Sequence, residues 1–79
     1  MRKEMYRMNL DRKVVVMLLQ NGKSQQEIAQ QVGTTQPHVS NWLNGTRFPN
    51  SQNLKKLADV LNVSTQELAE KLSQIAEMS

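Results

Sequence analysis

A helix-start signal followed by a glycine is the most constraining feature of this chain. Ser24 and Glu27 form an S-x-x-E capping box. In such a box the serine hydroxyl accepts a hydrogen bond from a backbone N–H of the first helical turn, and the glutamate reaches back to the N–H of the serine. Gly33 then provides the backbone freedom that a helix end and a sharp turn require. The pattern predicts a short helix that starts after Ser24 and ends near Gln31.

A second short helix is predicted directly after the glycine. Thr34 and Thr35 are candidate N-caps, and Pro37 lies in the first turn, where the missing N–H of proline costs little. This helix is expected from about Gln36 to Asn44. Apolar residues at helical spacing are predicted to face inward in both helices, namely Ile28, Ala29 and Val32 in the first and Val39, Trp42 and Leu43 in the second.

The faces that remain outside are rich in amides and almost free of charge. They carry Gln25, Gln26, Gln30 and Gln31 on the first helix and Gln36, His38, Ser40, Asn41 and Asn44 on the second. A side-chain amide donates and accepts at once, so from a helix in the major groove it can pair with N6 and N7 of adenine. Amide-rich faces are also common on helices that only contact water, so the surrounding motif has to separate the two interpretations.

The chain before this pair predicts one more helix. Asn9 is a candidate cap for a helix that ends around residues 21–22. Residues 1–8 fit two interpretations, a helix with methionines at helical spacing or a loose basic arm. The residues of the predicted helix that are expected to face the core are Leu10, Val14, Met17 and Leu18.

Two helices are predicted after the pair. Asn50 is the expected cap of a helix that runs to Leu61 or Asn62. Ser64 and Glu67 form a second capping box, which starts a last helix from about residue 65 towards residue 77. No internal repeat or interdomain linker interrupts the pattern, so residues 1–79 are predicted to form a single domain.

The segment from Ser24 to Gly45, SQQEIAQQVGTTQPHVSNWLNG, and the downstream run FPNSQNLKKLADVLNVSTQEL resemble the helix-turn-helix of the lambdoid phage repressor and Cro proteins. This is a broad family of small prokaryotic repressors, controllers and antitoxins. The resemblance covers roughly Leu10 to Leu68 and rests on the joint placement of Ala29, Gly33 and the inward residues of the second helix. It implies a compact all-α domain of five helices, in which helices 2 and 3 form the helix-turn-helix at residues 24–45.

The resemblance also implies roles for individual residues. Gln36 opens the second motif helix, where these repressors commonly place a glutamine on a base, and it is expected to read an adenine. Pro37 stands at a reading position that is usually polar, so it contacts a thymine methyl or makes no direct contact. Asn41 is a second expected base reader, and His38 contacts a base or a phosphate or is merely exposed. The residues expected to contact phosphate are Gln25, Asn44, Thr46 and Arg47.

One position departs from the pattern of the family. Many members have a glutamate where this chain has Leu43, often paired with an arginine of the first helix. The corresponding first-helix residue here is Leu18, which is also apolar. We therefore expect a hydrophobic contact between these two leucines in place of an ion pair, an exchange that often leaves stability unchanged or improved.

Composition excludes several classes of protein. The chain has a net charge of +3, no cysteine and a single histidine, so neither a disulfide nor a zinc site can form from its own residues, and no cofactor is expected. No nucleophile and base stand in a credible arrangement, so we do not expect an enzyme. The longest apolar run, residues 14–19, is far shorter than a membrane span. These features predict a cytoplasmic protein that does not enter a membrane.

Charge is divided unevenly along the chain. Residues 1–13 hold five basic and two acidic residues, whereas residues 51–79 hold three basic and four acidic ones. A phosphate-binding surface is therefore expected near the amino-terminal half and the motif, and the last helix is poorly suited to face DNA. The basic start itself fits a DNA contact or an ordinary solvated tail equally well.

The last helix, predicted within residues 64–78, carries an apolar stripe at i, i+4 and i+7 spacing. Because one recognition helix reads only a few base pairs, a homodimer on a two-fold site is expected. The stripe is a candidate dimer surface, and the alternative is that its first members only seal the core of one chain. Its residues are Leu68, Leu72, Ile75 and Met78.

The function predicted from all of this is a sequence-specific regulator of transcription that binds double-stranded DNA through the major groove. It is expected to act as a repressor, as a dimer on a palindromic operator. The alternative is a protein-interaction module, an antitoxin or antirepressor, that uses the same scaffold to bind a protein partner, because a fold does not by itself settle function.

Overall fold

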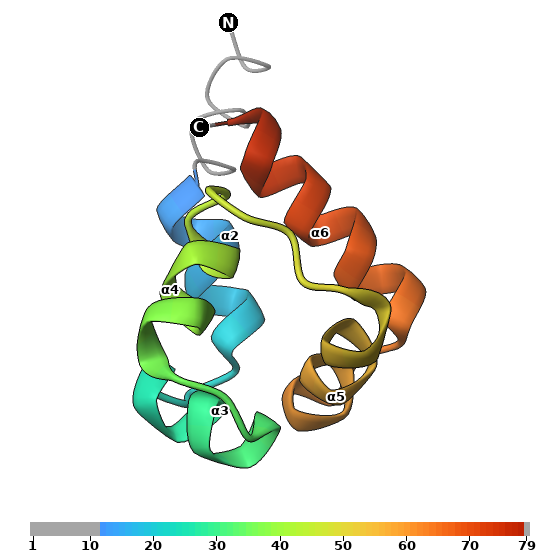
Figure 1. The fold of residues 1–79 in the computed structure, drawn as a ribbon. Helices are drawn as coiled ribbons and strands as arrows, with labels where there is room; N and C mark the ends of the chain where they lie inside the picture. Colours follow the sequence, from blue (N-terminus) through green and yellow to red (C-terminus); the bar gives the residue numbers. More distant parts are fainter. Residues whose placement is uncertain (1–11, 79) are drawn as a thin grey trace, which may run out of the picture.

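The computed structural model describes residues 12–78, which form five helices and no strand (Figure 1). The helices are α2 (Arg12–Gln20), α3 (Gln25–Val32), α4 (Gln36–Leu43), α5 (Ser51–Leu61) and α6 (Thr65–Glu77). The predicted all-α class is confirmed. The candidate cap Asn9, the predicted core residue Leu10 and the candidate arm at residues 1–8 lie outside the described residues.

Four helices begin at the residues that the capping signals indicate. Each cap side chain accepts a hydrogen bond from the backbone N–H three residues further on, which would otherwise lack a partner in the helix. The N···O distances are 3.0 Å at Ser24, 3.4 Å at Thr35, 2.8 Å at Asn50 and 3.0 Å at Ser64. These interactions define the starts of α3, α4, α5 and α6 at the residues that the sequence predicts.

The turn between α3 and α4 depends on Gly33. Its φ of 89° is in the left-handed region, which a glycine adopts without steric cost. The N–H groups of Gly33 and Thr34 both donate to the carbonyl of Ala29 at 2.9 Å, so the last turn of α3 is closed by its own backbone. The helix ends at Val32, one residue later than the sequence indicates, and α4 begins after three residues.

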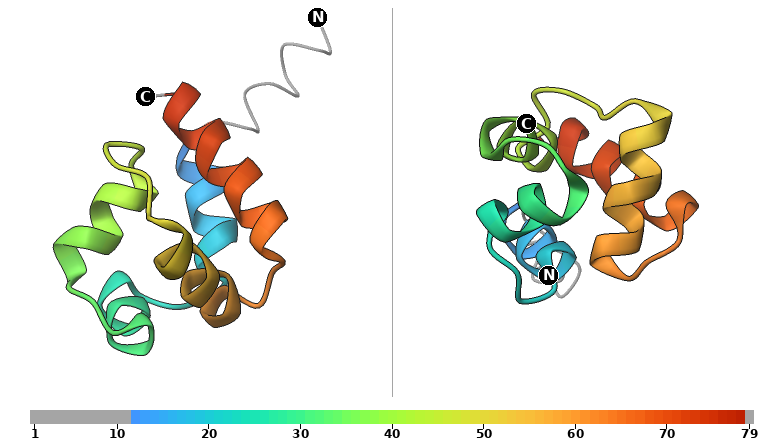
Figure 2. Two further views of the ribbon diagram at one scale, coloured as in Figure 1. Left: turned by 45° about the vertical axis from the view of Figure 1, so that its right-hand side comes forward. Right: turned by 60° about the horizontal axis from the view of Figure 1, so that its bottom comes forward.

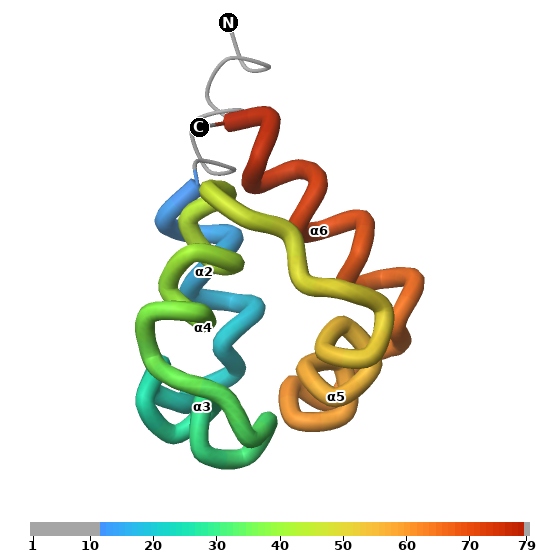
Figure 3. Tube along the Cα trace, viewed as in Figure 1, coloured from blue at the N-terminus to red at the C-terminus, as the bar shows by residue number. Residues whose placement is uncertain are grey.

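The helices pack around one apolar core. α3 contacts α4 and α5, whereas α6 contacts α2, α4 and α5. Figure 2 shows α6 running beside α2, and Figure 3 shows the loop from the end of α4 leading across to α5. All buried residues in the core of residues 12–78 are apolar, so the fold is held by packing. Those of the motif are the predicted ones, Ile28, Ala29, Val32, Val39, Trp42 and Leu43.

The inward face of α2 differs from the predicted one. Val15 and Leu19 are buried, with 7% of their surface exposed, while Met17 and Leu18 are 63% and 70% exposed and Val14 is half-buried. The prediction failed because residues 14–19 are all apolar, so the sequence offers several faces of similar hydrophobicity. Packing against α6 buries Val15 and Leu19, which are four residues apart and therefore lie on the same side of α2.

The apolar stripe of α6 was expected as a candidate dimer surface, but it lies against the core of the chain. Leu68, Leu72 and Ile75 are almost completely inaccessible within a single chain, and Met78 is half-buried against the same core. Because α6 contacts three other helices, these residues seal the core of one chain, which was the alternative interpretation. They do not form a surface stripe.

Two neighbouring leucines test which face of α2 is buried. Leu19→Ala removes a buried side chain and is expected to lower the free energy of unfolding by about 2–5 kcal/mol. Leu18→Ala is the matched control, and its effect should stay within about 0.5 kcal/mol because the side chain is exposed. Urea denaturation followed by circular dichroism measures both. A larger loss for Leu18→Ala than for Leu19→Ala would contradict the register.

Candidate nucleic-acid interface

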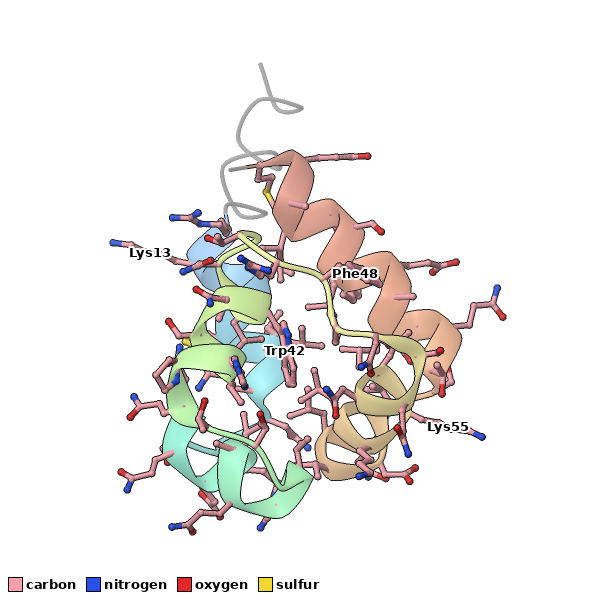
Figure 4. All side chains as sticks on the ribbon, viewed as in Figure 1. Lys13, Trp42, Phe48 and Lys55 are labelled. Carbon is pink, nitrogen blue, oxygen red and sulfur yellow. The ribbon has the colours of Figure 1, made fainter. Side chains whose placement is uncertain are left out.

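The first turn of α4 presents its side chains to solvent. Gln36, Pro37 and His38 are exposed, and Asn41, one turn further on, is half-buried. Trp42 points into the core (Figure 4) together with Val39 and Leu43; Pro37 and Asn41 lie on the opposite side of the helix, and Gln36 and His38 lie on its two flanks. The structure therefore places the four predicted base-reading residues on α4, three of them in its exposed first turn and Asn41 towards its other end.

This exposed turn carries no formal charge apart from the titratable His38. α4 contains no aspartate, glutamate, lysine or arginine. Amide and imidazole groups can recognise the donor and acceptor pattern of a base edge; uncharged polar side chains also bond phosphate, but charge-assisted bonds from cations are stronger. The chemistry of the turn is suited to reading bases, and the cations needed for phosphate have to come from neighbouring elements.

The imidazole of His38 is held by two neighbours. Its Nδ1 lies 2.8 Å from Oγ1 of Thr34, in the turn before the helix. The ring also stacks on the indole of Trp42, with 6.5 Å between the ring centroids and 19° between the planes. His38 therefore has a defined position at the surface, which sequence reasoning did not predict. The i, i+4 spacing to Trp42 within one helix was a usable signal, whereas the contact with Thr34 depends on the fold of the turn.

The loop that follows α4 is tied to the end of the helix. The N–H groups of Thr46 and Arg47 donate to the carbonyl of Asn41 at 3.0 Å and 3.2 Å. The amide oxygen of Asn44 accepts from the N–H of Thr46 at 3.0 Å and from its hydroxyl at 2.5 Å. Asn44, Thr46 and Arg47 are exposed. These three predicted phosphate-binding residues thus form a fixed group at the end of α4 opposite to Gln36.

A cleft of about 370 Å³ lies between α2, the start of α3 and the end of α4. Two predicted phosphate-binding residues, Gln25 and Asn44, line it. Three cations that were not predicted as site residues line it as well, namely Arg12, Lys13 and Lys23, and we call this region the basic cleft. Arg12 donates from Nη1 to the carbonyl of Asn44 at 3.3 Å, which links α2 to the end of α4.

The cations of the basic cleft come from separate parts of the sequence. Lys23 directly precedes Ser24, the cap of α3, and therefore lies at the start of the helix that also carries Gln25. Arg12 and Lys13 belong to the basic start of the chain, which by itself fitted a solvated tail equally well. The structure adds that Arg12 and Lys13 line a cleft next to the motif, and the position of Lys23 next to the cap was a usable signal.

The predicted contact between Leu18 and Leu43 is not supported by the structure. Leu43 is buried and lines the basic cleft with Val16 and Met17. Leu18 lies on another side of α2, in a groove that also contains Val63 and Lys71. Because α2 is rotated relative to the predicted register, Val16 and Met17 replace Leu18 as the apolar neighbours on the side of Leu43.

Two short helices joined by a left-handed glycine turn, with the second exposing an uncharged polar turn beside a basic cleft, define a helix-turn-helix DNA-binding domain. A helix-turn-helix family model matches residues 17–68, more than half of the chain. The chain therefore belongs to the Cro/CI-type helix-turn-helix family of DNA-binding regulators, which are typically not enzymes. No curated protein and no solved structure matches the chain.

No helix within residues 12–78 is both long enough and apolar enough to cross a bilayer.

The basic cleft can be tested through the salt dependence of DNA binding. Lys13→Gln removes a cation from the cleft and should lower the slope of log K against log salt by about 0.9, the contribution of one phosphate contact. Lys55→Gln is the matched control, because Lys55 projects from α5 on the other side of the molecule (Figure 4). Titration of a mixed-sequence duplex at several salt concentrations measures both slopes. Equal slopes for the two variants would show that the cleft does not contact phosphate.

Proposed function

We propose that this regulator is a sequence-specific repressor that inserts the first turn of α4 into the major groove of double-stranded DNA. The observation that supports it best is the exposure of Gln36, Pro37 and His38 on an uncharged helical turn whose other face is buried. A turn of this kind gains little from phosphate and is suited to the donors and acceptors of base edges. Repression follows if the bound protein occupies a site that RNA polymerase needs.

The individual contacts follow from the positions of the side chains. Gln36 is proposed to pair with an adenine through its amide, and Asn41 to read a second base from one turn further along α4. Pro37 can offer only apolar contact, which suits a thymine methyl. Phosphate contacts are assigned to Gln25 and Asn44, which line the basic cleft together, and to Thr46 and Arg47 in the loop that follows α4.

We further propose that the protein acts as a homodimer on a palindromic operator. One helix contacts too few base pairs to select a site, and two copies related by a two-fold axis double the contacted sequence. The buried stripe of α6 does not supply this contact. The large apolar side chains that remain exposed within residues 12–78 are Met17, Leu18 and Phe48, and a dimer interface is expected to cover at least one of them.

The exposure of Met17 and Leu18 also favours a second candidate function. An antitoxin or antirepressor would use an apolar surface of α2 to bind a protein partner, and DNA binding would be secondary. Selection from a pool of random duplex DNA separates the two candidates. An enriched palindromic motif supports the repressor and gives its half-site spacing, whereas the absence of any enriched motif favours the interaction module.

The role of Gln36 gives a direct test of base reading. Gln36→Ala is expected to weaken binding to the enriched site by about 1–3 kcal/mol and to relax the preference at one base pair. Gln66→Ala, an exposed glutamine in the first turn of α6, is the control and should bind like the unmodified protein. Fluorescence anisotropy on the enriched site and its single-base variants measures the effect. Identical affinities for the two variants would refute the assigned role.

The oligomeric state is tested by sedimentation velocity at micromolar concentration, with and without operator DNA. A dimer is expected at least on the DNA, with two copies per palindromic site. Met17→Lys, Leu18→Lys and Phe48→Lys then report which apolar residue the interface covers, because the charge should dissociate the dimer at that position alone. A single copy both in free solution and on the palindromic site would contradict the proposal.

A further inference from the structure

His38 is the single histidine of the chain and lies on the turn that we assign to base reading. Two contacts restrict its ring, the 2.8 Å approach of Thr34 Oγ1 to Nδ1 and the stack on Trp42. Trp42 is only 6% exposed, so the surface on which the ring rests is fixed by the core. The ring plane and one of its nitrogens are therefore set, and Nε2 is directed away from Thr34.

The contact with Thr34 also decides which nitrogen carries the proton. A hydroxyl can donate or accept, and a neutral imidazole has one nitrogen of each kind. The bare imidazole nitrogen is a much stronger base than a hydroxyl oxygen, so the stronger bond forms when the hydroxyl of Thr34 donates to Nδ1. The proton of the neutral ring then resides on Nε2, because the bond made by one ring nitrogen fixes the state of the other.

The helix and the turn that hold His38 contain no carboxylate that could accept a hydrogen bond from Nε2. α4 and the turn at residues 33–35 contain no aspartate or glutamate. Glu27 is the one carboxylate of α3, in its first turn, and the turn that carries Thr34 follows the other end of that helix. Within residues 12–78 no hydrogen bond is made to Nε2 of His38, so a donor at this atom is available to an acceptor from outside the protein.

We propose that Thr34 is a positioning residue that holds His38 in the Nε2–H form, so that His38 contacts DNA as a hydrogen-bond donor. Its partner on DNA is an acceptor, either a phosphate oxygen or an acceptor of a base edge such as O6 or N7 of guanine, and not an exocyclic amino group. This inference rests on the proposed function for its DNA partner, whereas the state of the ring in the free protein does not depend on it.

The ring state is tested first, without DNA. Two-bond 15N–1H correlation spectra at about pH 8, where an ordinary imidazole is neutral, distinguish the two tautomers, and a single histidine makes the assignment unambiguous. The Nε2–H form is expected in the unmodified protein and in Thr34→Ser, which keeps the hydroxyl. Thr34→Val keeps the shape and removes the hydroxyl, so its spectrum should shift towards the Nδ1–H form. A dominant Nδ1–H form in the unmodified protein, or no change in Thr34→Val, would overturn the positioning role.

The contact with DNA is tested on the enriched site. Thr34→Val and His38→Ala are each expected to weaken binding about three- to tenfold, and Thr34→Ser should restore the affinity. Thr65→Val is the matched control, because Thr65 is an exposed threonine at the start of α6, away from α4 (Figure 1). A base contact appears as a relaxed preference of His38→Ala at one base pair, whereas a phosphate contact weakens all sequences equally.

The failures of the two proposals are distinguishable. If Gln36→Ala weakens binding but His38→Ala and Thr34→Val bind like the unmodified protein, the inference about His38 is wrong and the proposed function stands. If no duplex is bound by any form, the proposed function fails together with the DNA contact of His38, and the spectra alone decide the positioning by Thr34. Loss of binding in Thr34→Ser as well as in Thr34→Val would mean that the hydroxyl is not the cause.

Discussion

The rotation of α4 about its own axis is fixed by three buried side chains, and the proposed DNA-contacting surface depends on it. Val39, Trp42 and Leu43 are spaced by three and one residues and lie on one side of the helix, against the core that α3 and α6 complete. Turning the helix by one residue, about 100°, would bring these side chains towards water and carry polar ones inward, at a cost of several kcal/mol. Gln36, Pro37 and His38 thus face outward as a consequence of packing.

In the proposed mode of binding, the surface around α4 divides two kinds of recognition between different elements. The exposed first turn of α4 contains no aspartate, glutamate, lysine or arginine, while cations and backbone-linked polar groups lie towards the other end of the helix, in the basic cleft and in the loop at residues 44–47. Direct readout of sequence takes place at base edges, and affinity comes largely from phosphate. Separating the two allows the affinity to be adjusted through α2 and the loop without changing the residues that select the sequence. The contacts of His38 with Thr34 and Trp42 restrict the position of its ring in the exposed turn of α4.

The motif was predictable from the sequence because its signals are local. Capping by Ser24, Thr35, Asn50 and Ser64 involves atoms three residues apart, and the left-handed conformation of Gly33 is a property of glycine itself. The exposed set on α4 followed from helical periodicity once the apolar residues were assigned inward. The basic cleft was only partly predictable, because Arg12, Lys13 and Lys23 are brought beside Gln25 and Asn44 by the packing of three separate elements.

The sequence by itself determined where the helices after Ser24 begin, because each cap acts within one turn of helix. Its helical periodicity also indicated which residues of the motif are buried and which side chains α4 exposes. Only the tertiary structure decided that Val15 and Leu19, rather than Met17 and Leu18, face the core, and that the stripe of α6 is buried. The physical reason is that a run of apolar residues, or an apolar stripe on a terminal helix, gains similar free energy from several partners. The partner is chosen by the packing of distant helices, above all of α6 against α2, α4 and α5.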